Sequence, residues 1–151
     1  IFEARRSESS RPKVAVHVLD GSPIQLFGMT FEPVLLAHGS ANIYGFRFGT
    51  VAYLTDHSDI PASSLERLRG LDVLFLDALR HTPHPTHSTV ERSLATVELL
   101  KPARTYFTHI CHDLPHEATE RQLPPRVRLA YDGLEIAFEA ELNGTGEDEA
   151  Q

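Results

Sequence analysis

The chain has 151 residues, of which 41% are hydrophobic, and this is enough for one domain with a buried core. Its formal net charge of −7 argues against long nucleic acid as a partner, because such binding needs a basic surface. No apolar run is long enough to span a membrane. The single cysteine, Cys111, excludes an intramolecular disulfide, and we expect a cytoplasmic protein.

The first part of the chain predicts short strands. Alternating apolar residues cover 13–19, and a longer segment covers 24–36 with a tight turn at Gly28. Residues 44–55 predict a hairpin around Gly49.

Beyond residue 55 the period of the hydrophobic pattern changes. The predicted elements are, in order, a helix over 63–70, a strand over 72–78, a helix over 88–102, a strand over 104–108, a short helix within 115–123 and a hairpin over 127–138 that turns at Asp132-Gly133. Both longer helices contain a serine followed three residues later by a glutamate, which predicts a capping box: Ser63 with Glu66, and Ser88 with Glu91. This alternation of strands and helices predicts an α/β fold.

Four of the predicted strands end in a polar residue capable of chemistry, namely His38, Asp56, Asp77 or His109. Ligands of α/β proteins collect beyond the carboxyl ends of strands, so we expect His38, Asp56 and His109 to form a metal site there. Imidazole nitrogen combined with carboxylate oxygen suits Zn²⁺, Mn²⁺ or Fe²⁺ better than Mg²⁺. Asp77 is left outside the predicted site, because anchoring of the next loop explains it equally well.

These residues also have structural interpretations. Taken alone, His38 is equally consistent with a hydrogen-bonded turn residue, Asp56 with a turn cap, and His109 with a loop residue. Their joint placement and order favour a site. Cys111 is interpreted as a small buried side chain, since no basic residue is placed to activate it as a nucleophile.

Three histidines, His81, His84 and His87, lie three residues apart, with Pro83 and Pro85 between them. The two prolines exclude a helical stripe, so the histidines are predicted to lie on a loop between a buried strand and a helix. Histidines on such a loop are more often exposed to solvent than catalytic, and their spacing is not that of a metal-binding motif.

The chain contains, in this order, the segments FEPVLLAHGSANIYGFRFG, VAYLTDHSDIP, LFLDALRHTPHPTHSTVE, YFTHICHD and LAYDGLEIAF. They resemble the metallo-β-lactamase-fold hydrolases, and most closely the branch of the phosphoribosyl 1,2-cyclic phosphate phosphodiesterase of the carbon–phosphorus lyase pathway. The resemblance runs from about Val14 to Phe138. It implies an αββα sandwich, of which residues 1–140 would form only the C-terminal part, followed by an acidic disordered tail at 141–151.

The resemblance also implies a site with two divalent metal ions, Zn²⁺ or Mn²⁺. His38 matches a ligand of the first ion, Asp56 the aspartate that bridges both ions, and His109 a ligand of the second. His87 matches the loop histidine that contacts the phosphate and acts as general acid, and His84 is expected to orient either His87 or the substrate. The implied substrate is a small phosphodiester, either cyclic or open.

The family motif H-x-H-x-D-H is absent, although it normally supplies two ligands to each metal. The residues present leave each metal two protein ligands, fewer than the three usual for catalytic zinc. We therefore expect the C-terminal portion of a longer hydrolase, with one apolar sheet face covered by a missing N-terminal half or by a second copy in a homodimer. Two alternatives stay open: a non-catalytic half-domain that binds a partner chain, and a hydrolase of thioesters or lactams.

Overall fold

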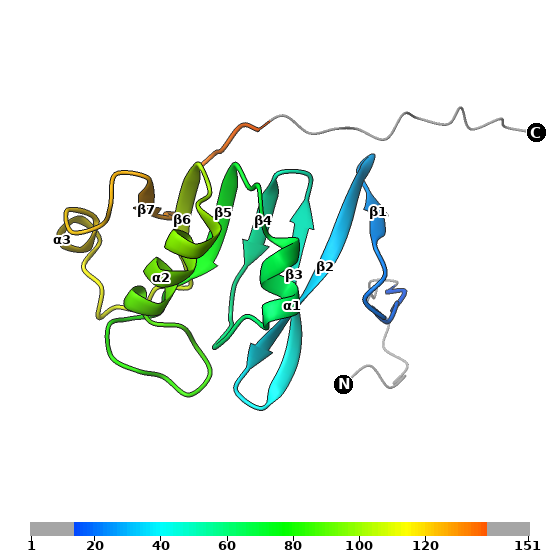
Figure 1. Cartoon of the computed structure of the whole chain (residues 1–151), viewed down its shortest axis with the longest axis horizontal. Coiled ribbons are helices and arrows are strands. Elements are labelled where there is room, and N and C mark those ends of the chain that lie inside the picture. Colours follow the sequence, from blue (N-terminus) through cyan, green and yellow to red (C-terminus); the bar gives the residue numbers. More distant parts are fainter. Residues whose placement is uncertain (1–13, 139–151) are drawn as a thin grey trace, which may run out of the picture.

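Seven strands pair in chain order into a single mixed sheet (Figure 1). The structure is a computed structural model and describes residues 14–138. The strands are β1 Ile24–Leu26, β2 Met29–His38, β3 Ala41–Phe48, β4 Val51–Leu54, β5 Val73–Asp77, β6 Arg104–Thr108 and β7 Val127–Leu129. The helices are α1 Ala62–Arg67, α2 Val90–Leu100 and α3 His116–Glu120. This architecture confirms the predicted α/β class.

The direction of the strands determines where a site can form. Neighbours are antiparallel from β1 to β4 and parallel from β4 to β7. Two antiparallel steps separate β2 from β4, so β2 runs in the same direction as β4, β5 and β6. The carboxyl ends of these four strands therefore lie at one edge of the sheet.

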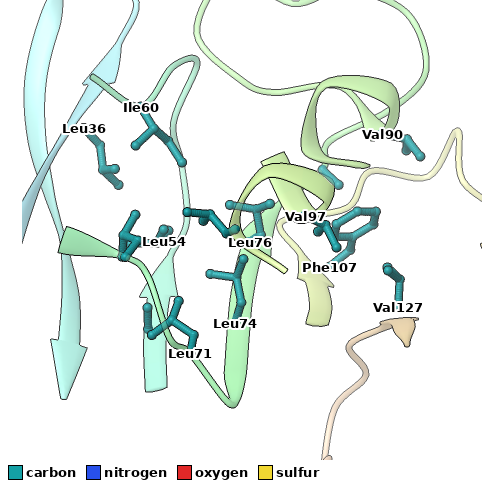
Figure 2. Packing of buried hydrophobic residues seen from close by; sticks show 14 of the residues in the cluster. Leu36, Leu54, Ile60, Leu71, Leu74, Leu76, Val90, Val97, Phe107 and Val127 are labelled. Atoms are coloured by element: carbon teal, nitrogen blue, oxygen red, sulfur yellow. The ribbon is translucent and has the colours of Figure 1, made fainter. Parts of the chain in front are cut away.

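The core lies between the sheet and the helices α1 and α2, which cover the same face (Figure 1). Leu76 and Phe107 are partners in register on β5 and β6, and both are fully buried. Val97 of α2 lies beside Phe107 in the packed cluster (Figure 2). Burying each such side chain contributes about 1.5–3 kcal/mol, so this layer fixes α2 and the loop that precedes it against the sheet.

Both predicted turns in the first half of the chain are confirmed. Phe27 and Gly28 join β1 to β2 with φ angles of 55° and 73°, as expected for a two-residue hairpin turn. Gly49, with a φ of 58°, lies in the turn between β3 and β4. A left-handed φ is readily adopted by glycine, which explains why these two glycines marked the turns.

Both predicted capping boxes are wrong. Helix α1 begins after Pro61, and no side chain caps it. Helix α2 is capped by Thr89, whose hydroxyl accepts a hydrogen bond from the backbone N–H of Arg92 at 3.3 Å. Ser88 is buried instead and shares a hydrogen bond of 2.8 Å with Ser93. In both helices the start differs from the prediction by one or two residues, because the surrounding packing determines which residue takes the extended cap conformation.

Two strand predictions are also wrong. Residues 14–19 form no strand, and Val14, Val16 and Val18 are 64%, 83% and 91% exposed. A strand needs a neighbour for its backbone groups, and nothing in residues 14–138 pairs with this segment. The hairpin over 127–138 reduces to β7 followed by a turn, in which the backbone N–H of Leu134 donates to the carbonyl of Tyr131 at 3.1 Å. The predicted tail at 141–151 lies outside the described residues.

The face of the sheet opposite α1 and α2 carries a row of aromatic side chains. Tyr53, Phe75 and Tyr106 are partners in register on β4, β5 and β6, with ring centroids 5.4 and 5.5 Å apart. Tyr53 is 41% exposed. Within residues 14–138, no helix is both long and apolar enough to cross a membrane.

Candidate metal site and histidine loop

The structure brings the three predicted metal ligands together at the carboxyl edge of the sheet. His38 is the last residue of β2, Asp56 lies two residues beyond β4, and His109 directly follows β6. The Oδ1 atom of Asp56 lies 3.6 Å from His38 Nδ1 and 3.6 Å from His109 Nε2. Asp56 is therefore placed between the two histidines.

The backbone is strained at two of these residues. Asp56 and His109 have φ angles of 63° and 57°, in the left-handed region that side chains other than glycine rarely adopt. Such conformations cost about 1–3 kcal/mol each and are concentrated at functional sites. At both positions the strained backbone holds a side chain of a kind that can bind a metal ion. Asp56 lies just beyond β4 and His109 just beyond β6, and both strands pair in parallel with a neighbour.

One hydrogen bond orients the imidazole of His38. Its Nδ1 lies 2.9 Å from the carbonyl oxygen of Asp56, which can only accept, so Nδ1 carries the proton. The lone pair of the ring is then on Nε2. A histidine that donates through one nitrogen and offers the other is the usual arrangement of a metal ligand.

Asp77 belongs to the same group of side chains, although the sequence prediction excluded it. Its carboxylate is fully buried, and Oδ2 accepts hydrogen bonds from the backbone N–H of His57 at 3.1 Å and from His87 Nδ1 at 3.3 Å. Burial raises the pKa of Asp77 to about 6. Burial also lowers the pKa of the neighbouring His57 to about 4. The sequence did contain a signal for Asp77, because this carboxylate ends an almost continuously apolar segment. A buried acidic side chain needs hydrogen-bonding or charged partners, so its position predicts contacts with other polar groups.

His87 is the member of the predicted loop that enters the site. Its Nδ1 lies 3.4 Å from Asp56 Oδ1, and its ring is 4.7 Å from that of His109 between centroids. Burial lowers the pKa of His87, while the charge of Asp56 opposes this effect. His84 packs against His87 with ring centroids 4.7 Å apart. We call residues 79–88 the histidine loop.

His81 lies away from the site. Its Nδ1 contacts Glu91 Oε1 at 2.6 Å, and both side chains are at least half exposed. The three histidines of the loop thus separate into two that face the site and one that pairs with the first turn of α2.

The residues present fit a divalent metal ion. Donor atoms of Asp56, Asp77, His87 and His109 all lie within 4.8 Å of one another, and we call these four residues the donor cluster. Within the described part of the chain, Asp77 Oδ1 is buried and has no hydrogen-bond partner, which is costly for a carboxylate oxygen unless a cation or water satisfies it. The mixture of imidazole and carboxylate groups suits zinc-like or manganese-like ions.

Comparison with known proteins places this chain in a family. Residues 1–110 match the sequence profile of the beta-lactamase superfamily domain. A solved diphosphatase from the PhnP family is 60% identical, with a TM-score of 0.82 over 83% of this chain and 50% of that chain. The metallo-β-lactamase-fold protein YhfI from Bacillus subtilis is 16% identical, with a TM-score of 0.66 over 79% of this chain and 52% of that chain. At this lower identity, the likeness to YhfI shows the fold alone.

A protein named octanoyltransferase from Porphyromonas gingivalis is 36% identical over 119 residues, which are 78% of this chain and 24% of that protein. The chain therefore spans about half the length of the diphosphatase and about a quarter of the octanoyltransferase. The names of these relatives describe the whole proteins.

Proposed function

The chain belongs to the beta-lactamase superfamily and has the metallo-β-lactamase fold, and from this we propose that it carries part of the active site of a metal-dependent hydrolase that cleaves a small phosphodiester. One observation carries the proposal. His38, Asp56 and His109 converge at one sheet edge in a chain that is 60% identical to a diphosphatase. The acidic net charge of −7 favours a small-molecule substrate over long nucleic acid.

In this proposal His38 and Asp56 hold one divalent ion, and Asp56 and His109 hold the other. When bound, the two ions supply Lewis-acid stabilisation of the phosphoryl oxygens and lower the pKa of the attacking water. The sequence contains no H-x-H-x-D-H motif, so further ligands would come from outside residues 1–151, either in the same protein or in a partner.

We assign to His87 the role of general acid. As the water oxygen bonds to phosphorus and the P–O bond to the leaving group breaks, His87 gives its proton to the departing oxygen. The contact of Nδ1 with Asp77 Oδ2 at 3.3 Å holds one ring nitrogen, so the proton that is transferred is the one on Nε2, which the ring carries only in its doubly protonated form. Asp77 is then the residue that orients the ring, in addition to His84, whose ring packs against it.

A substrate panel tests the proposal. The metal-loaded protein, completed by the part of the protein or the partner that supplies the further ligands, is given bis(4-nitrophenyl) phosphate, a small diphosphate ester, a thioester and a chromogenic β-lactam, with the Asp56→Ala variant as the inactive control. Hydrolysis of the phosphodiester above the Asp56→Ala background supports the proposal. Cleavage of the thioester or lactam alone would contradict the proposal and show that the same site cleaves a different bond. Preference for the diphosphate ester would indicate a substrate like the one that the name of the solved diphosphatase implies.

The sheet face opposite α1 and α2 favours a second candidate, a module that binds a partner chain. The aromatic row on this face includes Tyr53, which is 41% exposed, and the exposed valines of residues 14–19 offer further apolar surface. Size-exclusion chromatography separates the two candidates: a partner-binding module should elute as a complex or dimer and show no metal-dependent hydrolysis.

A further inference from the structure

We propose that Arg80 is a positioning residue, which fixes the histidine loop so that His87 stays over the donor cluster. The inference rests on the proposed function in one respect, because it takes His87 as the general acid. Arg80 follows β5 by three residues and lies at the start of the loop.

The loop needs a side chain to shape it. Its ends are joined by backbone hydrogen bonds, from the N–H of Leu79 to the carbonyl of Ser88 at 3.0 Å and from the N–H of Val90 to the carbonyl of Arg80 at 3.1 Å. Between these ends, no backbone–backbone hydrogen bond ties residues 81–87 to any other described residue. The conformation of this segment must therefore be held by side chains. His81, His84 and His87 contact Glu91, Thr86 and Asp77 respectively.

The guanidinium of Arg80 holds the part of the segment nearest to it. Its Nε donates to the carbonyl of Thr82 and its Nη2 to the carbonyl of Pro83, both at 3.2 Å. Its Nη1 lies 4.0 Å from Oδ2 of Asp113, in the segment that follows His109. One side chain thus joins the loop that carries His87 to the segment that carries His109.

On its far side the loop lies against the turn that follows β2, which limits how a shift near Arg80 can be absorbed there. A Cβ atom placed on Gly39, the residue after His38, would lie 3.0 Å from Thr86 Cγ2. Pro83 and Pro85 restrict the backbone between the two contacts. Movement of the carbonyls that Arg80 holds would consequently be transmitted to the residues that follow, including His87.

The arrangement requires an arginine. A guanidinium presents five N–H donors in a planar fork, and three of its nitrogens face three different groups here. A lysine ammonium keeps the positive charge but cannot reach two successive carbonyls and Asp113 in the same geometry. Arg80→Lys therefore separates the geometric role from a role of the charge alone, and Arg80→Met removes both.

The first measurement is backbone ¹⁵N NMR relaxation, which does not depend on activity. Residues 81, 82, 84, 86 and 87 carry the amides of the segment 81–87, since positions 83 and 85 are prolines. Arg80→Met and Arg80→Lys should both lower the backbone order parameters at these amides, toward the values below about 0.6 that mark flexible backbone, and leave β5 and α2 unchanged. The matched control is Arg69→Met, which removes an exposed arginine paired only through its side chain with Glu66.

The second measurement is turnover of the metal-loaded protein with two aryl phosphodiesters, one with a nitrophenolate leaving group and one with a phenolate. A poor leaving group depends more on a proton donor, so Arg80→Met should lower kcat about tenfold more for the phenyl ester. In a His87→Ala background, Arg80→Met should have no further effect, because it acts through His87.

The outcomes are distinct. Unchanged order parameters in the loop, full retention of turnover in Arg80→Lys, or additive losses in the double variant would each overturn the positioning role. If the unsubstituted protein, loaded with metal and completed by the part that supplies the further ligands, cleaves neither ester, the proposed function fails. The order parameters alone then decide whether Arg80 fixes the loop.

Discussion

At the scale of single residues, Asp56 connects the parts of the candidate site. Three histidines, His38, His87 and His109, approach its Oδ1 atom at 3.4–3.6 Å. Two of them are predicted metal ligands, and the third is the predicted general acid. Removal of the Asp56 carboxylate should therefore affect metal binding, whereas removal of the His87 imidazole should affect turnover.

Asp56→Ala should empty both metal positions together, since the side chain is assigned to both. His87→Ala should leave the metal content unchanged and lower turnover by about 10²–10⁴-fold, the range expected for loss of a general acid. Metal analysis of the purified variants by inductively coupled plasma mass spectrometry, combined with steady-state kinetics, checks both expectations.

Asp59→Ala is the matched control, because Asp59 lies three residues further on and its exposed carboxylate contacts Arg92 instead of the site. Retention of one full equivalent of metal in Asp56→Ala would refute the bridging role. Equal loss of metal in His87→Ala would make His87 a ligand, a result compatible with its place in the donor cluster and opposed to its role as acid.

At the scale of elements, the start of α2 illustrates how a local motif is overruled by packing. The pattern Ser88 with Glu91 predicts a capping box, but the hydroxyl of Ser88 is buried against Ser93. Thr89 takes the cap position with a ψ of 164°. The sequence alone cannot distinguish neighbouring serine and threonine residues as caps, because either can accept from the backbone.

Thr89→Ala should lower the free energy of unfolding by about 1 kcal/mol, because it removes the cap of α2. Ser63→Ala should change it by less than about 0.5 kcal/mol, since α1 has no side-chain cap. Urea denaturation followed by circular dichroism measures both values. A larger loss for Ser63→Ala than for Thr89→Ala would contradict the assignment of the caps.

The convergence of the three candidate ligands was easier to predict than the elements at the two ends of the described chain. His38, Asp56 and His109 could be found because each follows an apolar strand, and strands that run in the same direction end at one edge. Asp77 was excluded because the hydrogen bonds that join it to His57 and His87 appear only in three dimensions. Residues 14–19 have the alternation of a strand, but alternation does not say whether a neighbouring strand exists.

At the scale of the whole molecule, the predicted ligands come from distant parts of the chain. His38 and His109 are 71 positions apart in the sequence. His38 ends β2 and His109 follows β6, and these two strands lie on opposite sides of β4 in the sheet. An ion held between them and Asp56 would link these parts, and it would bind the folded chain in preference to the unfolded chain.

Metal binding should therefore stabilise the protein. At a free ion concentration one hundred times the Kd, the gain is about 2.7 kcal/mol, and the midpoint of thermal unfolding should rise by about 5–10 °C. Differential scanning fluorimetry with and without a chelator measures the shift. The Asp56→Ala variant should show no such shift, and an equal rise in that variant would place the bound ion elsewhere.

The left-handed backbone at Asp56 and His109 has a consequence for the way this sequence can change. Glycine or asparagine would relax the backbone at both positions, so selection for thermal resistance in the absence of metal should favour their replacement. Selection with metal present should oppose it, because the bound ion stabilises the folded chain. A library screened for heat tolerance in the presence of a chelator is therefore expected to lose these two side chains early and to yield more stable proteins without a metal site.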